Sequence, residues 1–181
     1  SIFSLQSLCL RRNEIKKLEN LETLTSLEEL DFYDNQISKI ENLDRLVNLS
    51  CHHVFLFVFQ SNRIVELKGL EHLDSLEELY ISHNGIEEIK GLESLAKLNT
   101  LDLASNRIKR ISNVGHLLNL EEFWFNDNQL EHWEDLDELA KCPKLHTVYL
   151  ERNPLSRDTA YRRKVKLALP ALKQIDATLC H

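Results

Sequence analysis

The sequence predicts an α/β solenoid with a short parallel sheet on its concave face, 3₁₀ or helical turns on its convex face, and a C-terminal cap. Two observations support this prediction: an asparagine that recurs with a period of 22 residues, and apolar residues that keep fixed offsets from it. A unit of this length cannot bury its own apolar face, so such units gain a core by stacking on their neighbours. The chain of 181 residues holds about seven of them.

The recurring asparagine follows an L-x-x-L-x-L-type run in each unit. In the clearest unit, Leu101 and Leu103 precede the asparagine, and Ile108 and Ile111 follow it. The alternating part predicts a short strand, and the later i, i+3 spacing predicts a helical or 3₁₀ turn packed behind that strand. The spacing is 22 residues except for one gap of 27 and one of 25, and the positions are Asn13, Asn35, Asn62, Asn84, Asn106, Asn128 and Asn153.

Two polar columns of the repeat have structural explanations. A buried carboxamide at the end of each strand can bond to backbone groups of adjacent coils that would otherwise lack partners. Seven residues further on stand residue types that tolerate left-handed or turn geometry. We therefore expect a turn in each coil at Asn20, Asn42, Gly69, Gly91, Asn113 and Asp135.

The first break in the period lies at residues 49–60. Five extra residues lead into the apolar run 54–59, so we expect this segment to be irregular and the register of its strand to be poorly specified. Cys51, His52 and His53 could begin a metal site. Adjacent residues cannot all converge on one ion, and no second ligand cluster has suitable spacing, so a loop is favoured.

The apolar ladder stops after Leu155, and the chain continues with a different pattern. Residues 161–165 predict a helix and residues 172–176 a return strand, with Pro170 ending the helix. A solenoid needs a cap over its last apolar layer. We therefore predict a repeat array over residues 1–155 and a C-terminal cap over 156–181, whose basic run near Arg162 is a solvated face.

Composition and motifs exclude several classes of function. The 22 basic and 29 acidic residues give a net charge of −7, which argues against binding nucleic acid through its phosphates. No apolar run approaches the roughly 20 residues of a membrane-spanning helix, so no membrane association is expected. Phosphate-loop, HExxH and GxSxG motifs are absent and the acidic residues are spread by the repeat. We expect neither an enzyme nor a metal or cofactor site.

Two further features concern the state of the chain. The cysteines lie too far apart to form a dense disulfide framework, which favours a reducing compartment; they are Cys9, Cys51, Cys142 and Cys180. Methionine is absent even at position 1, so we expect a trimmed or fragmentary chain. We expect a monomer in the absence of a partner.

Strand residues that alternate away from the core suggest a function. Four residues before the ladder asparagines stand Cys9, Asp31, Val58, Tyr80, Asp102, Trp124 and Tyr149, and six before them stand Ser7, Glu29, Leu56, Glu78, Thr100, Glu122 and Thr147. This surface is acidic and aromatic, the mixture typical of a protein-recognition patch. The alternative is a solvated sheet face with incidental aromatic side chains. The candidate partner-binding residues are Asp31, Tyr80, Asp102, Glu122, Trp124 and Tyr149.

The repeat from Leu76 to Leu92 resembles the 22-residue class of the leucine-rich repeat family, and the resemblance extends from Leu5 to Leu155. Three stretches, residues 79–86, 122–128 and 148–155, are similar to the leucine-rich regulatory subunits of protein phosphatase 1. This similarity implies a nuclear and cytoplasmic, non-catalytic protein that binds the phosphatase catalytic subunit on its concave face without a cofactor. It also implies that Asp102, Glu122, Trp124 and Tyr149 contact the phosphatase.

One difference and one alternative accompany this resemblance. Members of that family have a longer array, and several middle repeats look missing here, which would remove part of the interface. Short repeats of this class also resemble those of axonemal dynein light chains and of a spliceosomal protein-binding subunit. The alternative function is therefore a leucine-rich repeat adaptor for another protein partner.

Overall fold

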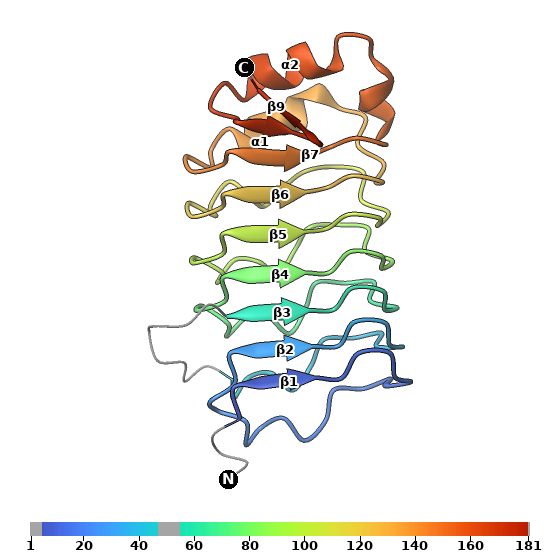
Figure 1. Ribbon diagram of the computed structural model, residues 1–181, viewed down its shortest axis with the longest axis vertical. Coiled ribbons are helices and arrows are strands. Elements are labelled where there is room, and N and C mark those ends of the chain that lie inside the picture. Colours follow the sequence, from blue (N-terminus) through green and yellow to red (C-terminus); the bar gives the residue numbers. More distant parts are fainter. Residues whose placement is uncertain (1–4, 47–54, 181) are drawn as a thin grey trace.

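The computed structural model describes residues 5–46 and 55–180, and these form one sheet of nine strands in sequence order (Figure 1). The first seven strands are parallel and stack along the long axis of the molecule. They are β1 (Ser7–Cys9), β2 (Glu29–Asp31), β3 (Leu56–Val58), β4 (Glu78–Tyr80), β5 (Thr100–Asp102), β6 (Glu122–Trp124) and β7 (Thr147–Tyr149). The solenoid predicted from the repeat is confirmed.

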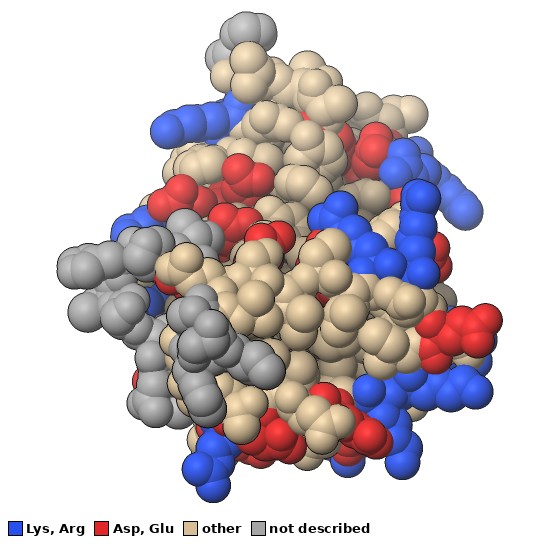
Figure 2. Space-filling view, turned by 60° about the horizontal axis from the view of Figure 1, so that its bottom comes forward, with Lys and Arg blue, Asp and Glu red and all other residues tan. Residues whose placement is uncertain are grey.

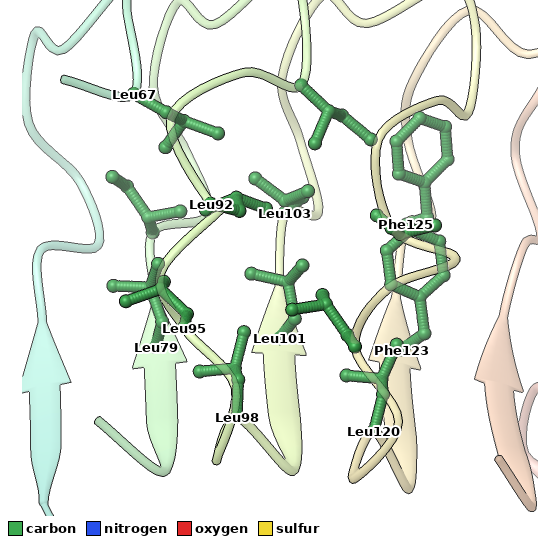
Figure 3. Packing of buried hydrophobic residues seen from close by; sticks show 14 of the residues in the cluster. Leu67, Leu79, Leu92, Leu95, Leu98, Leu101, Leu103, Leu120, Phe123 and Phe125 are labelled. Carbon is green, nitrogen blue, oxygen red and sulfur yellow. The ribbon is translucent and has the colours of Figure 1, made fainter. Parts of the chain in front are cut away.

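The middle residue of each strand points into the core. Leu79, Leu101 and Phe123 are aligned partners on neighbouring strands, and all three are fully buried. In Figure 3 the returning segment with Leu92 and Leu95 lies against the strands of Leu79 and Leu101, and Leu120 of the next returning segment lies beside Phe123. Every coil thus covers the apolar side chains of the next one, which a single coil could not do alone.

The ladder asparagines bond adjacent coils together, as the sequence predicts. The Nδ2 of Asn106 donates to the carbonyl oxygens of Leu103 at 3.0 Å in its own coil and Ile81 at 3.3 Å in the preceding coil. Its Oδ1 accepts the backbone N–H of Ile86 at 3.0 Å. One buried carboxamide therefore pairs backbone groups that two coils would otherwise leave unsatisfied. The same three kinds of bond recur at Asn35, Asn62, Asn84, Asn128 and Asn153.

The predicted turn column is confirmed at five positions and wrong at the sixth. Asn20, Asn42, Gly69, Gly91 and Asn113 have positive φ angles between 55° and 82°. At Gly91 a Cβ atom would lie 2.0 Å from the carbonyl oxygen of Leu67, so a side chain is excluded by close approach as well.

Asp135 is the exception, with a φ of −67°. Its buried carboxylate accepts hydrogen bonds from the guanidinium of Arg110 and from the backbone N–H of Ile111. Asp135 thus occupies the same position in the repeat as the turn residues, but it forms an ion pair between coils and does not adopt a positive φ angle.

A second left-handed column precedes each ladder asparagine, and the sequence pattern did not predict it. The φ angles there lie between 53° and 57°, at Arg12, Asp34, Ser61, His83, Ser105, Asp127 and Arg152. Non-glycine residues rarely adopt this conformation. The residue types vary too much along the column to indicate a left-handed turn.

The expectation of poor strand register is wrong for residues 55–60. β3 pairs in register with both neighbours, with Phe57 opposite Leu30 and Leu79. Phe57 and Phe59 are fully buried, and Phe59 stacks on Phe32 with ring centroids 5.8 Å apart. These aromatic core positions hold the strand although the outward positions are apolar too. Residues 47–54, which include the Cys51, His52 and His53 run, lie outside the described residues.

Helices are confined to the C-terminal end within the described part of the chain. A 3₁₀ helix η2 (Trp133–Asp135) leads into α1 (Leu136–Leu139), whereas the earlier returning segments consist of turns. The expected convex turns are present in the earlier coils as single turns closed by i→i+3 backbone bonds of the 3₁₀ type, such as the bond from the N–H of Leu95 to the carbonyl of Leu92 at 3.1 Å. Among the described residues, longer helical segments form only in the last coil before the cap and in the cap itself.

The cap region contains the predicted helix and return strand. It begins with η3 (Pro154–Arg157) and α2 (Tyr161–Ala168), which lie at the end of the solenoid in Figure 1. Strand β8 (Gln174–Ile175) adds to β7 in parallel, and β9 (Thr178–Leu179) pairs with β8 in the antiparallel sense. Buried side chains of the cap, among them Val165 and Leu172, join the same core. No helix in the described residues is long and apolar enough to cross a membrane.

We expect Leu101→Ala to lower the free energy of unfolding by roughly 2 to 5 kcal/mol, because its fully buried side chain has coils on both sides and would leave a cavity. Urea unfolding monitored by circular dichroism measures the change. The exposed Lys109→Ala is the control. Equal midpoints for the two variants would contradict the core position of Leu101.

We expect Asn106→Ala to cost about 1 to 3 kcal/mol of unfolding free energy, because buried backbone groups of two coils lose their partner. The half-buried Asn119→Ala, which loses a bond to the carbonyl of Ala96 and one from the exposed side chain of Lys144, should cost less because water can replace both partners. The same urea titrations compare the two. If both variants unfold at the same midpoint, the carboxamide does not hold the coils together.

Candidate functional site

Three aromatic side chains meet on the face of the sheet turned away from the core, called here the concave sheet face. Tyr80 comes from β4, Trp124 from β6 and Tyr149 from β7. The ring centroids of Tyr80 and Trp124 are 6.0 Å apart, and those of Trp124 and Tyr149 are 5.6 Å apart. Both separations lie within the range in which aromatic pairs attract one another. All three side chains are half-buried, so each keeps a surface open to solvent.

Hydrogen bonds to nearby carboxylates hold the polar atoms of two of these rings. The hydroxyl of Tyr80 donates to Glu78 at 2.9 Å, and the indole N–H of Trp124 donates to Glu122 at 3.2 Å. In both strands the carboxylate stands two residues before the ring, on the same face. Burial raises the pKa of the Tyr80 hydroxyl, and the hydrogen bond to Glu78 raises it further. These two rings are thus held in a fixed orientation by carboxylates of their own strands.

Asp102 lies beneath the aromatic rings rather than in solvent. Its strand β5 is between β4 and β6, and it aligns with Tyr80 on one side and Trp124 on the other. Because those two rings lean toward each other across it, Asp102 is only 2% exposed. The sequence pattern, which gives only the direction of a side chain, had suggested an open acidic residue.

The buried carboxylate of Asp102 has several partners. It accepts the backbone N–H of Ala104 at 2.9 Å and the Nε2 amide of Gln60 at 2.7 Å, and it also bonds to Ser82. Burial nevertheless raises the pKa of Asp102, because desolvation outweighs these bonds.

Asp31 is separate from the other candidates. It lies on β2, and the apolar outward residues Leu56 and Val58 of β3 come between it and Tyr80. Its side chain is fully covered and pairs with Arg11, and it accepts the backbone N–H of Tyr33. The structure therefore brings together Tyr80, Asp102, Glu122, Trp124 and Tyr149, and leaves Asp31 apart. That any of the six contacts a partner stays a prediction.

A shallow hollow of about 660 Å³ adjoins the aromatic group. Its middle is formed by small side chains, Ser82 and Ala104, each two residues before a ladder asparagine. The sequence-based prediction covered only the positions four and six residues before the asparagine, so it missed this row. A constant offset of two residues before the asparagine would have located it. The hollow is lined by Tyr33, Gln60, Ser61, Ser82, His83, Asp102, Ala104, Trp124, Asn126, Tyr149, Glu151 and Arg152.

An ion pair lies at the edge of this hollow. Arg152 contacts Asp127 through two bonds, from Nε to Oδ1 at 2.6 Å and from Nη2 to Oδ2 at 2.8 Å. The guanidinium lowers the pKa of Asp127. This two-point contact joins neighbouring coils and limits the motion of Arg152.

Charge is unevenly distributed over the surface. Viewed obliquely from the N-terminal end, many Lys and Arg side chains gather on the right of Figure 2, while its centre is largely uncharged. The right is the side toward which the strands run in Figure 1. Within residues 5–46 and 55–180, no three His, Cys, Asp or Glu side chains are placed to hold a metal ion.

The chain belongs to the leucine-rich repeat family. Residues 71–179 match the family model described as leucine-rich repeat, and residues 4–52 match a model of two leucine-rich repeat copies. This class of protein agrees with the stacked coils, the asparagine ladder and the cap described above.

Among individual proteins, the chain is similar to protein phosphatase 1 regulatory subunit 7. It is 74% identical to the Homo sapiens protein over 34 residues and 69% identical to the Xenopus tropicalis protein over 36 residues. It is also 58% identical over 38 residues to protein phosphatase 1 regulatory subunit SDS22 of Schizosaccharomyces pombe. These alignments cover 19 to 20% of this chain and 9 to 11% of the curated relatives.

Solved structures extend the likeness in fold. An internalin, inlF, from Listeria monocytogenes has a TM-score of 0.81 and 30% identity, over 98% of this chain and 49% of the internalin. A chain of the Drosophila melanogaster SNF/U2A′ complex has a TM-score of 0.67 and 26% identity, over 79% of this chain and 87% of that one.

We expect Asp102 to make stability fall as pH rises. Burial raises its folded-state pKa above the ordinary value of 3.8, so the folded state holds the proton more tightly. Its contribution is complete below the unfolded pKa and is lost as pH rises through the folded pKa. The unfolding free energy of wild type minus that of Asp102→Asn should therefore decrease above about pH 4. Urea titrations across the acid range measure this difference.

The exposed Asp74→Asn serves as the control for general effects of charge removal. Its difference from wild type should stay nearly constant over the same range. A difference that rises with pH for Asp102→Asn would show that hydrogen bonding outweighs burial at this carboxylate.

Proposed function

We propose that this chain is a non-catalytic regulatory subunit that binds the catalytic subunit of protein phosphatase 1 through its concave sheet face, in the nucleus and the cytoplasm. The observation that carries the proposal is the aromatic group of Tyr80, Trp124 and Tyr149 with its carboxylates. The regulatory-subunit names of its relatives support the choice of partner.

The geometry of the group suits protein recognition. Trp and Tyr contribute most to binding when they are buried centrally in an interface, and here three such rings form one contiguous surface. The hydrogen bonds to Glu78 and Glu122 restrain two of the rings, which reduces the conformational entropy lost on binding. The same carboxylates add negative charge, which favours a basic region of the partner and speeds its approach.

A second candidate function is an adaptor for a different protein. The likeness to a chain of the SNF/U2A′ complex supports it, because that match covers most of both chains. We favour the phosphatase because the relatives with 69 to 74% identity are its regulatory subunits, whereas the SNF/U2A′ match has 26% identity.

We expect Trp124→Ala to weaken binding of the purified phosphatase 1 catalytic subunit by about 2 kcal/mol or more, because a central aromatic contact is lost. Calorimetric titration measures the affinity, and urea unfolding checks that stability is nearly unchanged. The matched control is Glu93→Ala, an exposed carboxylate outside the aromatic group.

Two outcomes would contradict the proposal. If the wild-type chain shows no heat of binding, it does not bind this partner by itself, and the adaptor function is favoured. If Trp124→Ala binds as tightly as wild type while the wild type does bind, the partner uses another surface.

A further inference from the structure

Tyr149 differs from the other two rings in the source of its hydrogen bond. Tyr80 and Trp124 bond to a glutamate two residues earlier on their own strand. The equivalent position on β7 is Thr147, which is buried, and its Oγ1 lies 3.0 Å from the Nδ1 of His146. A threonine is also too short to reach the hydroxyl of Tyr149. Strand β7 therefore offers no partner of its own to this ring.

The partner comes from the C-terminal cap. The Nε2 of Gln174, on β8, donates to the hydroxyl oxygen of Tyr149 at 2.7 Å. We infer that Gln174 is a positioning residue of the concave sheet face, holding Tyr149 against Trp124 in the orientation that a protein partner meets. The part of this inference that concerns a protein partner rests on the proposed function. The positioning of Tyr149 rests on the contacts of the cap alone.

Gln174 is itself held by the fold. It aligns with Thr147 across the parallel pair β7 and β8, and its Nε2 also donates to the carbonyl oxygen of Asp176 at 2.8 Å. One amide group thus bridges the ring and the turn that follows β8. A side chain with two bonds in different directions has little freedom to turn away.

The side chain of Asp176 is itself held by groups from the segment after β7 and from α2. Its Oδ1 accepts the backbone N–H groups of Leu150 at 2.8 Å and Glu151 at 3.0 Å. The hydroxyl of Tyr161, on α2, donates to its Oδ2 at 3.0 Å. A continuous set of hydrogen bonds therefore runs from the helix of the cap to the ring of Tyr149.

The consequence is that the cap has a second role besides covering the last apolar layer. Without the amide of Gln174, Tyr149 would keep its place on the strand but could leave the ring contact with Trp124. Binding would then have to restore that contact at an entropic cost. The effect acts through Tyr149, so it requires the hydroxyl group of that residue.

A double-mutant cycle tests this dependence. Gln174→Leu keeps the volume of the side chain and removes its amide, and Tyr149→Phe removes the hydroxyl. We expect Gln174→Leu to weaken phosphatase binding about threefold to tenfold, the range that corresponds to one hydrogen bond, and to have no further effect in the Tyr149→Phe background. Gln129→Leu, at an exposed glutamine outside the hollow, is the control.

A spectroscopic readout makes the test independent of the partner. The chain has two tryptophans, so Trp133→Phe leaves Trp124 as the only one. In that background, Gln174→Leu should change the fluorescence anisotropy decay of Trp124 and its quenching by acrylamide, and Gln129→Leu should not. Tyr149→Phe should abolish the response to Gln174→Leu. Thermal unfolding of each variant confirms that the cap remains folded.

The outcomes separate the two proposals. If Gln174→Leu leaves Trp124 fluorescence unchanged, or acts equally with and without the hydroxyl of Tyr149, Gln174 only stabilises the cap and the inference is overturned. If the fluorescence responds as expected but wild type does not bind the phosphatase, the positioning role stands and the proposed function fails.

Discussion

The bonding of adjacent coils by one buried carboxamide is the interaction on which the rest of the structure depends. Parallel strands of three residues have few backbone bonds of their own, and the segments behind them are mostly turns. From Asn35 onward, each ladder asparagine supplies partners to groups of two coils at the point where the strand ends, as Asn106 does. Because a buried unpaired polar group is costly, this residue both permits the tight coil and sets its register against the next.

Fixed register also creates the candidate site. Side chains at one offset from the asparagine form a row across the sheet, so Tyr80, Asp102 and Trp124 are aligned although 44 residues separate the first from the last. The strand spacing of about 4.8 Å lets large rings on alternate strands meet above a smaller residue between them. An aromatic surface over a buried carboxylate is the result. The cap adds one more strand to the sheet, on which Gln174 aligns with Thr147, and from that neighbouring row its side chain reaches the hydroxyl of Tyr149.

Much of the fold could be predicted from the sequence because the same pattern of apolar residues and asparagine occurs in every repeat. The 22-residue period, the strand positions, the asparagine bonds and the cap helix all depend on local offsets, which are visible in the chain. Predictions failed where one coil departs from the others. Asp135 has the residue type of a turn but forms an ion pair with Arg110, and the apolar strand β3 keeps its register through Phe57 and Phe59.

The sequence by itself determined which side chains share a face of the sheet, because alternation along a strand and a constant offset leave no other choice. Only the tertiary structure decided which of those side chains touch, and how far each is covered. Asp31 and Asp102 occupy the same repeat position, yet one pairs with Arg11 and the other lies under two rings. The physical reason is that side-chain burial depends on the size and reach of neighbours from other coils, which the offset within one coil does not contain.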